Sequence, residues 1–294
     1  MVARIAMLSC CHASLLLLAG QLAAAGANPS EIQVVPGNIK ETRGTEQHPG
    51  TMEVELKAVL ADNVIDAMAY RMIVSKAVDD TGVDLVRPES AASEFQTLDS
   101  NRSVKAKLKS PARNAVAIKE LSGDVELFCP KKDPAAMVVV NAFRKHTEKP
   151  IESATLKSAG IQVAAWTSDE YRALEKKREA EMPAAVKSAQ LQARNLFLER
   201  FGNNNAGMGP NDFIFTINGA QEKLIGFEFR DRADKTVPTR GSGVGYKQMG
   251  PQIERTLSYH FDGRLPDTTK LVIFVATPQA LVKVPFTLAN VVLP

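Results

Sequence analysis

The sequence predicts a mainly β protein, made of two antiparallel β-sandwich modules that a helical segment joins. About eleven short stretches alternate apolar and polar residues with a period of two, the pattern of a strand with one buried face. Turn residues separate these stretches. The regular strand–helix–strand alternation of a parallel sheet is missing, and this favours antiparallel pairing.

Composition and charge fit an ordinary globular protein. Of the 294 residues, 36 are Lys or Arg and 33 are Asp or Glu, which gives a formal net charge of +3. Hydrophobic residues make up 45% and charged residues 23%, close to the average for globular domains. These values exclude a disordered chain, a collagen-like repeat and a disulfide-stapled miniprotein. The near balance of charges also excludes a strongly basic nucleic-acid binder.

Residues 1–27 have the pattern of a secretory signal peptide. Arg4 is the only charged residue, an apolar run is centred on residues 15–20, and the small residues 23–27 offer cleavage sites. The apolar run is shorter than the ~20 residues that a membrane-spanning helix needs. We therefore expect a secreted or periplasmic protein that has no membrane span once the signal is removed.

The rest of the chain divides into four parts by composition. Residues 28–50 are rich in Pro and Gly and predict a flexible leader, with a short strand at 31–35 as an alternative within it. The first β-sandwich module is expected at 51–166, a helical connector at 167–202, and the second β-sandwich module at 203–294. Both modules are predicted to contain a strand that enters an acidic turn, which suggests an internal repeat.

In the first module, residues 64–73 also fit a helical stripe, but we favour a short helix over 62–69 followed by a hairpin over 71–86. Its strands are expected at 52–58, 71–78, 83–86, 104–109, 124–129, 136–143 and 161–166.

The connector begins with a capping-box pattern over Thr167–Glu170, and Pro183 splits it into two helices. In the second module, residues 239–250 are predicted to be a glycine-rich loop. Its strands are expected at 213–217, 223–230, 253–261, 270–276 and 281–288.

The acidic turns are the best candidates for ligand binding. Asp79, Asp80 and Asp84 lie close together in the first module, and Asp231 and Asp234 do so in the second. Carboxylates and backbone carbonyls in sandwich loops are able to bind calcium. Ordinary hairpin turns also favour aspartate without any metal. The first group is therefore a weak candidate for a calcium site, and no other cofactor is predicted.

Cysteine usage predicts a fold held by its core alone. Cys10 and Cys11 lie in the signal peptide, so Cys129 is the single cysteine of the mature chain. With no disulfide between the sheets, the modules are only loosely immunoglobulin-like. Cys129 follows an apolar run and is expected to be buried. The alternative is a reactive thiol paired with His146.

Three histidines remain after signal removal: His48, His146 and His260. They are isolated in sequence, so the spacing of a zinc site is missing. His260 is a candidate base, with Asp262 as its orienting carboxylate. A solvent-exposed histidine at the end of a strand explains the presence of His260 equally well.

These observations favour an exported, non-catalytic protein that binds a protein or a cell-surface component. Neither nucleic acid nor a membrane span is expected. The alternative is an extracytoplasmic hydrolase that uses His260 or Cys129. A histidine within hydrogen-bond reach of a carboxylate or nucleophile in a cleft distinguishes the enzyme from the binding protein.

Overall fold

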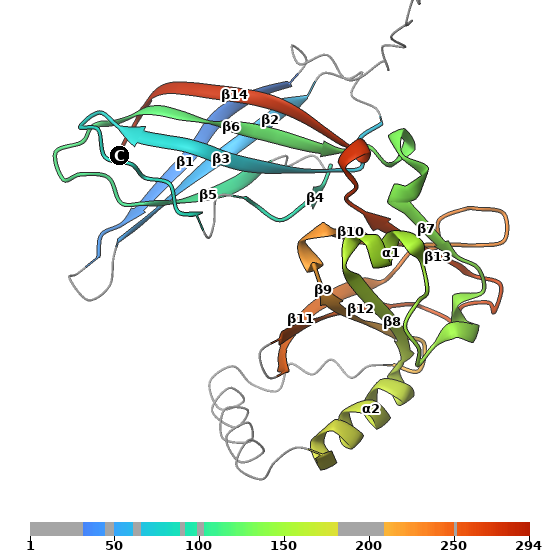
Figure 1. The fold of residues 1–294 in the computed structure, drawn as a ribbon. Coiled ribbons are helices and arrows are strands. Elements are labelled where there is room, and N and C mark those ends of the chain that lie inside the picture. Colours follow the sequence, from blue (N-terminus) through green and yellow to red (C-terminus); the bar gives the residue numbers. More distant parts are fainter. Residues whose placement is uncertain are drawn as a thin grey trace, which may run out of the picture.

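The fold is described from a computed structural model, which covers residues 32–44, 50–60, 66–88, 92–98, 103–181, 209–249 and 252–294. The described chain is mainly β and forms four antiparallel sheets. Figure 1 shows that the sheets gather into two units. The predicted signal peptide and the second half of the predicted connector lie outside the described residues.

The first unit contains two sheets around one core. One sheet has the order β1-β2-β5, and the other β14-β6-β3-β4. The strands are β1 (Ile32–Thr42), β2 (Thr51–Leu60), β3 (Ala69–Asp79), β4 (Gln96–Thr97), β5 (Ser103–Lys109), β6 (Ala117–Phe128) and β14 (Leu281–Val292). Alternate residues of each sheet, such as Val54 in β2 and Val125 in β6, are buried in a single cluster. Burial of these apolar side chains is the main force that holds the sheets together.

The second unit is built in the same way around an aromatic core. Its sheets have the orders β11-β12-β9-β8 and β10-β13-β7. The strands are β7 (Met137–Val140), β8 (Ile161–Thr167), β9 (Phe213–Gly219), β10 (Leu224–Arg230), β11 (Gly241–Met249), β12 (Gln252–His260) and β13 (Lys270–Val275). Phe143 packs edge-on against Phe213, with ring centroids 5.0 Å apart. Phe229 packs in the same manner against Phe261 at 4.9 Å.

The two units exchange strands. β7 follows β6 in sequence, yet it pairs with β13 of the second unit. β14 follows β13, yet it pairs with β6 of the first unit along nearly its whole length. The first unit therefore contributes β7 to the second unit along the chain after β6, and the second unit is followed by β14, which returns to the first unit. The sheets divide the chain differently from the expected boundaries of 51–166 and 203–294, because β7 and β8 belong to the second unit and β14 belongs to the first.

The two connections that carry these strands across pack against each other. Phe128 at the end of β6 meets Phe274 near the end of β13, with ring centroids 6.2 Å apart and nearly perpendicular rings. Both belong to a small buried cluster that also includes Ala136 and Ala280. The N–H of Cys129 donates a 2.7 Å hydrogen bond to the carbonyl of Ala280. The crossing point is therefore a buried contact that ties the two units together.

Two α-helices flank the second unit, α1 (Ala154–Ala159) and α2 (Ser168–Glu181). The predicted capping box is confirmed: the N–H of Thr167 donates to Glu170 Oε2 at 2.7 Å, and the N–H of Glu170 donates to Thr167 Oγ1 at 3.4 Å. The described part of this helix reaches Glu181, and the predicted break at Pro183 lies outside the described residues. No helix of the described residues is long and apolar enough to cross a membrane.

The structure differs from the sequence-based prediction in three local segments. The leader was expected to hold at most a short strand over 31–35, but residues 32–42 form the longer strand β1. The register shift between Pro36 and Ile39 accommodates the missing proline N–H on this edge strand. The glycine-rich segment predicted as a loop at 239–250 forms β11, because it pairs regularly with β12. The expected return strand at 83–86 is reduced to a single bridge between Val78 and Asp84.

Candidate functional site

The first acidic turn uses its carboxylates to hold the backbone. Asp79 is fully buried. Its Oδ1 accepts hydrogen bonds from the N–H and hydroxyl of Thr81 and from the N–H of Val83, and its Oδ2 accepts from the N–H of Ala112 at 2.9 Å. Burial raises the pKa of Asp79, but these donors outweigh burial and hold its pKa below the ordinary value.

The neighbouring carboxylates are also occupied. Asp80 accepts from the N–H of Val116, and Asp84 accepts from the N–H of Val86 and lies 3.8 Å from the ammonium of Lys109. In the part of the chain that the structure describes, no three His, Cys, Asp or Glu side chains gather as a metal site would require. Hairpin chemistry therefore accounts for the contacts of these aspartates, and the calcium site stays a prediction.

The second acidic turn repeats the first. Oδ1 of Asp231, like that of Asp79, accepts hydrogen bonds from the N–H groups two and four residues later. Each aspartate also donates its own N–H to the carbonyl four residues later. Gly82 and Asp234, each three residues after the aspartate, have positive φ angles of 93° and 61°. The same local structure in both units supports the internal repeat.

Cys129 lies in the core of the first unit and is only 4% exposed. Burial raises the pKa of its thiol, although Lys132 acts in the opposite direction. A thiol with a raised pKa is rarely ionised near neutral pH and is a poor nucleophile. His146 lies on an exposed turn of the second unit, and no contact between the two is found among the described residues. The predicted thiol–imidazole pair is not formed, and Cys129 acts as a small buried hydrophobe.

His260 has a carboxylate partner, but a different one from that predicted. Its Nδ1 lies 2.8 Å from Oδ2 of Asp212, whereas Asp262 is exposed beyond the end of the strand. Asp212 also accepts from the N–H of Gly209 at 2.6 Å. The imidazole is 26% exposed. Ser168, which donates to the carbonyls of Gly209 and Asp212, is itself buried, so its hydroxyl is committed to the loop.

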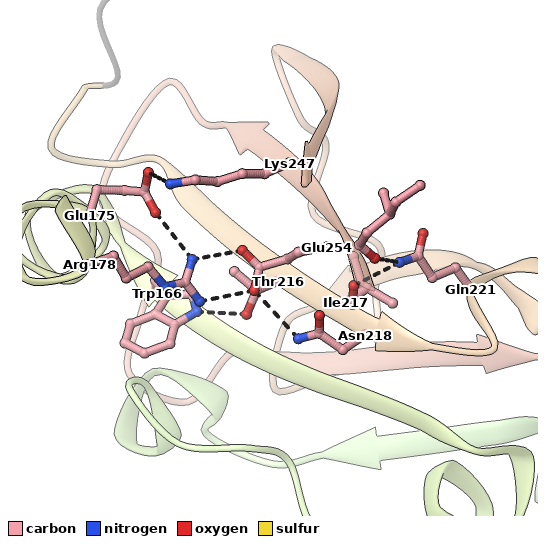
Figure 2. Close-up of polar contacts among 10 residues, drawn as sticks. Trp166, Glu175, Arg178, Thr216, Ile217, Asn218, Gln221, Lys247 and Glu254 are labelled. Atoms are coloured by element: carbon pink, nitrogen blue, oxygen red, sulfur yellow. Dashed lines mark hydrogen bonds and ion pairs between the residues drawn. The ribbon is translucent and has the colours of Figure 1, made fainter. Parts of the chain in front are cut away.

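A polar network fixes α2 to the outer face of the sheet that contains β9 and β12 (Figure 2). Glu254 of β12 is only 2% exposed and receives two hydrogen bonds from Arg178 of α2, at 2.8 and 3.0 Å. Asn218 donates to the same carboxylate at 3.4 Å. Arg178 and Lys247 both contact Glu175. Every member has a partner, so this network positions the helix and leaves no group free for a ligand.

Tyr171 of the same helix lies beside this network. Burial, with the negative charges of Glu175 and Glu254, raises its pKa to about 12. Its hydroxyl is therefore neutral at physiological pH. Below it, the indole N–H of Trp166 donates a 3.0 Å hydrogen bond to the hydroxyl of Thr216. The outer face is thus closed by α2 along this part of the sheet.

On the other face of the same sheet, at the part of β11 and β12 that holds Tyr246 and Arg255, a cleft of about 410 Å³ lies between the two units. The first unit contributes Arg71 of β3 and residues 92–95. The second unit contributes the start of β10, Tyr246 of β11 and Arg255 of β12. The strand exchange brings these segments together, because it holds both units at one crossing point near the cleft.

Arg71 is fixed on the first-unit side of the cleft. Its Nε and Nη2 both lie 2.6 Å from Oε2 of Glu126, directly opposite on β6. Lys283 of β14 lies 3.1 Å from the other oxygen of the same carboxylate. The guanidinium stacks on the ring of Phe95, 4.5 Å from its centroid. The ion pair with Glu126 and the stacking on Phe95 therefore hold the Arg71 side chain in one position at the side of the cleft.

Arg255 is different, because it has no such partner. Among the described residues, its buried Nε has no hydrogen-bond acceptor, and no ion pair joins it to Glu94 or Glu222, which line the same cleft. Tyr246 lies directly opposite it on β11 and is 59% exposed. A guanidinium without an ion pair to a described residue, beside an exposed aromatic ring, is a site suited to a carboxylate carried by an apolar ligand.

Sequence reasoning missed this cleft. Tyr246 was placed in a glycine-rich loop, and Arg255 has no motif around it. Only the pairing of β11 with β12 and the meeting of the two units bring Arg255, Tyr246 and Phe95 to one cavity. Comparison with protein families, characterised proteins and solved structures finds no match to this chain.

Proposed function

We propose that this chain is an exported, non-catalytic protein that binds a protein or a cell-surface component, and that its cleft receives a carboxylate-bearing segment of a partner protein. We also propose that each unit is a β-sandwich, loosely immunoglobulin-like, with its two sheets closed on one core. The shared burial of alternate residues from both sheets supports the sandwich. The signal-peptide pattern of residues 1–27 supports export.

The single observation that carries the binding proposal is the Nε of Arg255, which has no acceptor among the described residues. A buried guanidinium nitrogen without an acceptor is unfavourable in the free protein, and a ligand carboxylate would satisfy it. Tyr246 and Phe95 line the same cleft and offer apolar surface on either side. Clefts between domains are common binding sites, and exposed aromatic and arginine side chains dominate binding energy at protein interfaces.

The experiment is selection of peptides on the purified mature protein. A phage-displayed library of random heptapeptides is panned on the wild type, and the binding of the enriched peptides is then measured on the wild type and on the Arg255→Gln variant. We expect enriched sequences with Asp or Glu between apolar residues, and binding weakened ~10-fold or more by Arg255→Gln. The matched control is Arg264→Gln, an exposed arginine of the second unit outside the cleft. Equal binding to Arg255→Gln and wild type would contradict the proposal.

A hydrolase is the second candidate function, and the contact of His260 with Asp212 favours it. A carboxylate that accepts from Nδ1 leaves Nε2 free to act as a base. A nucleophile is still needed, and Cys129 is buried in the other unit. A panel of chromogenic ester, peptide and glycoside substrates tests this function. Activity that is lost in His260→Ala supports the hydrolase, and its absence in the wild type contradicts it.

A further inference from the structure

β11 is an edge strand whose outer side no described strand covers. Its sheet has the order β11-β12-β9-β8. The opposite edge, β8, is covered by the segment before α1, since the N–H groups of Glu148 and Ile151 donate to the carbonyls of Ala165 and Val163. Among the described residues, no segment makes the equivalent hydrogen bonds to β11. The strand therefore offers a row of backbone groups for pairing.

Three other edge strands of the described sheets carry features that discourage pairing, and β11 lacks them. β1 has Pro36 and an irregular register, β14 has Pro285, and β5 has Lys105 and Lys107. β11 has neither proline nor bulge, and it pairs with β12 in unbroken register. Its one lysine is already paired with Glu175. The contrast marks β11 as an edge left open for a partner.

The two faces of β11 differ sharply. Val244 and Tyr246 are 57% and 59% exposed and lie on the cleft face, directly opposite Leu257 and Arg255 of β12. The other face has glycines at 241, 243 and 245. A methyl group at Gly245 would lie 2.6 Å from the hydroxyl of Thr256, and one at Gly243 would lie 2.8 Å from that of Ser258. The glycines therefore keep this face flat.

We propose that the partner segment binds as an additional β-strand along β11, with alternate apolar side chains on Val244 and Tyr246 and an acidic side chain directed to Arg255. This inference rests on the proposed function and names its binding mode. Main-chain hydrogen bonds supply affinity in such strand addition, and the side chains of one face supply specificity. Because β11 lies between them, the added strand is two strand spacings, about 9.6 Å, from β12. A glutamate side chain of the added strand and the side chain of Arg255 together span this distance.

A second copy of this chain is a less suitable occupant of the edge. Pairing of β11 with β11 of another copy would satisfy the backbone, but the segment Gly241–Met249 contains no Asp or Glu. Arg255 would remain without a carboxylate on both sides. Charge complementarity therefore favours a different protein that carries an acidic, otherwise apolar, extended segment.

Hydrogen exchange with a peptide selected as above tests the binding mode. We expect the β11 amides that point away from β12 to exchange at least ~10-fold more slowly in the complex, as for edge amides that enter a ladder. We also expect peptide variants N-methylated at alternate positions to lose binding, because methylation removes the donors. Val244→Lys should weaken binding ~10-fold or more, whereas Val292→Lys, a change at an exposed valine on the β14 edge, should not.

The outcomes separate the two proposals. Arg255-dependent binding without protection of β11, and without sensitivity to N-methylation, overturns strand addition and leaves binding in the cleft intact. Protection of β11 in the free protein, together with a dimer in sedimentation analysis, assigns the edge to a second copy and also overturns it. Peptides that bind independently of Arg255 overturn the proposed function itself. The hydrogen-exchange result uses the wild type, so it stands even where Val244→Lys fails to fold.

Discussion

The hydroxyl of Thr277 donates a 2.6 Å hydrogen bond to Oδ2 of Asp133 and so joins the two connections that exchange strands between the units. Asp133 lies on the connection from β6 to β7, and Thr277 lies on the connection from β13 to β14. The other oxygen of Asp133 accepts from the N–H of Ala135 at 3.0 Å and caps a short 3₁₀ turn. One buried carboxylate therefore fixes both crossing segments.

Removal of this carboxylate should destabilise the protein more than removal of its donor. Asp133→Ala loses both the cap and the link and should lower the free energy of unfolding by about 2 kcal/mol. Thr277→Val loses the link and leaves one oxygen without a donor, for about 1 kcal/mol. Urea denaturation followed by circular dichroism measures both. Equal effects of the two changes would show that the cap contributes nothing.

The strand exchange predicts that the two units unfold together. Leu121 is fully buried in the first unit, and Trp166, the only tryptophan, lies in the second. Leu121→Ala should cost about 2–5 kcal/mol. Because β14 belongs to the first unit and continues from β13 of the second, this loss should shift the unfolding transition that Trp166 fluorescence reports.

The control for coupling is the wild-type protein, in which fluorescence and circular dichroism should give coincident transitions. Val163→Ala, a change at a buried residue of the second unit, should shift the fluorescence transition directly. Its shift is the reference for a change made in the same unit as Trp166. A Leu121→Ala variant whose fluorescence midpoint stays at the wild-type value would show that the units unfold independently in spite of the exchange.

The pair of Arg178 and Glu254 should behave as a buried ion pair. Arg178→Met leaves the Glu254 carboxylate buried without its main donor and should lower the free energy of unfolding by about 3 kcal/mol. Adding Glu254→Gln to this variant removes the stranded charge and should recover most of the loss. A double-mutant cycle in urea measures the coupling. Additive effects of the two changes would contradict this account of how α2 is held.

Individual strands and turns could be predicted from the sequence better than the pairing of one strand with another. The alternation of Val104, Ala106 and Leu108 with lysines predicted β5, because the period of two records which face is buried. The acidic turns and the capping box were recognisable, since their hydrogen bonds run between residues a few positions apart. β11 was missed and the length of β1 was underestimated, because proline and glycine there indicate loops until pairing with a neighbour outweighs local preference.

The cleft and the strand exchange were beyond sequence reasoning for a related reason. The alternation of β14 shows that one face is buried, but it does not state that β6 is its neighbour. Arg71 and Arg255 come from different units, and nothing near either residue in the sequence indicates that they line one cavity. The partner of His260 was also misplaced, because Asp212 is distant in sequence, whereas Asp262 is close in sequence but exposed.

The last prediction concerns pH and the carboxylate of Asp79. Its pKa is lower in the folded protein than in the unfolded chain, because the donors from Ala112, Thr81 and Val83 outweigh the effect of burial. The ionised form therefore adds stability that is fully present above the unfolded pKa of about 3.9 and is lost as pH falls through the folded pKa. Asp79→Asn should cost about 2 kcal/mol at pH 7, since its amide group cannot accept from every donor.

Urea midpoints measured from pH 7 to pH 2 should converge for wild type and Asp79→Asn at the acid end. The control is Asp267→Asn, a change at an exposed aspartate, which should keep the wild-type profile apart from the small effect of its ion pair with Arg144. A constant difference between wild type and Asp79→Asn across that range would show that Asp79 does not ionise in the folded protein as its hydrogen bonds imply.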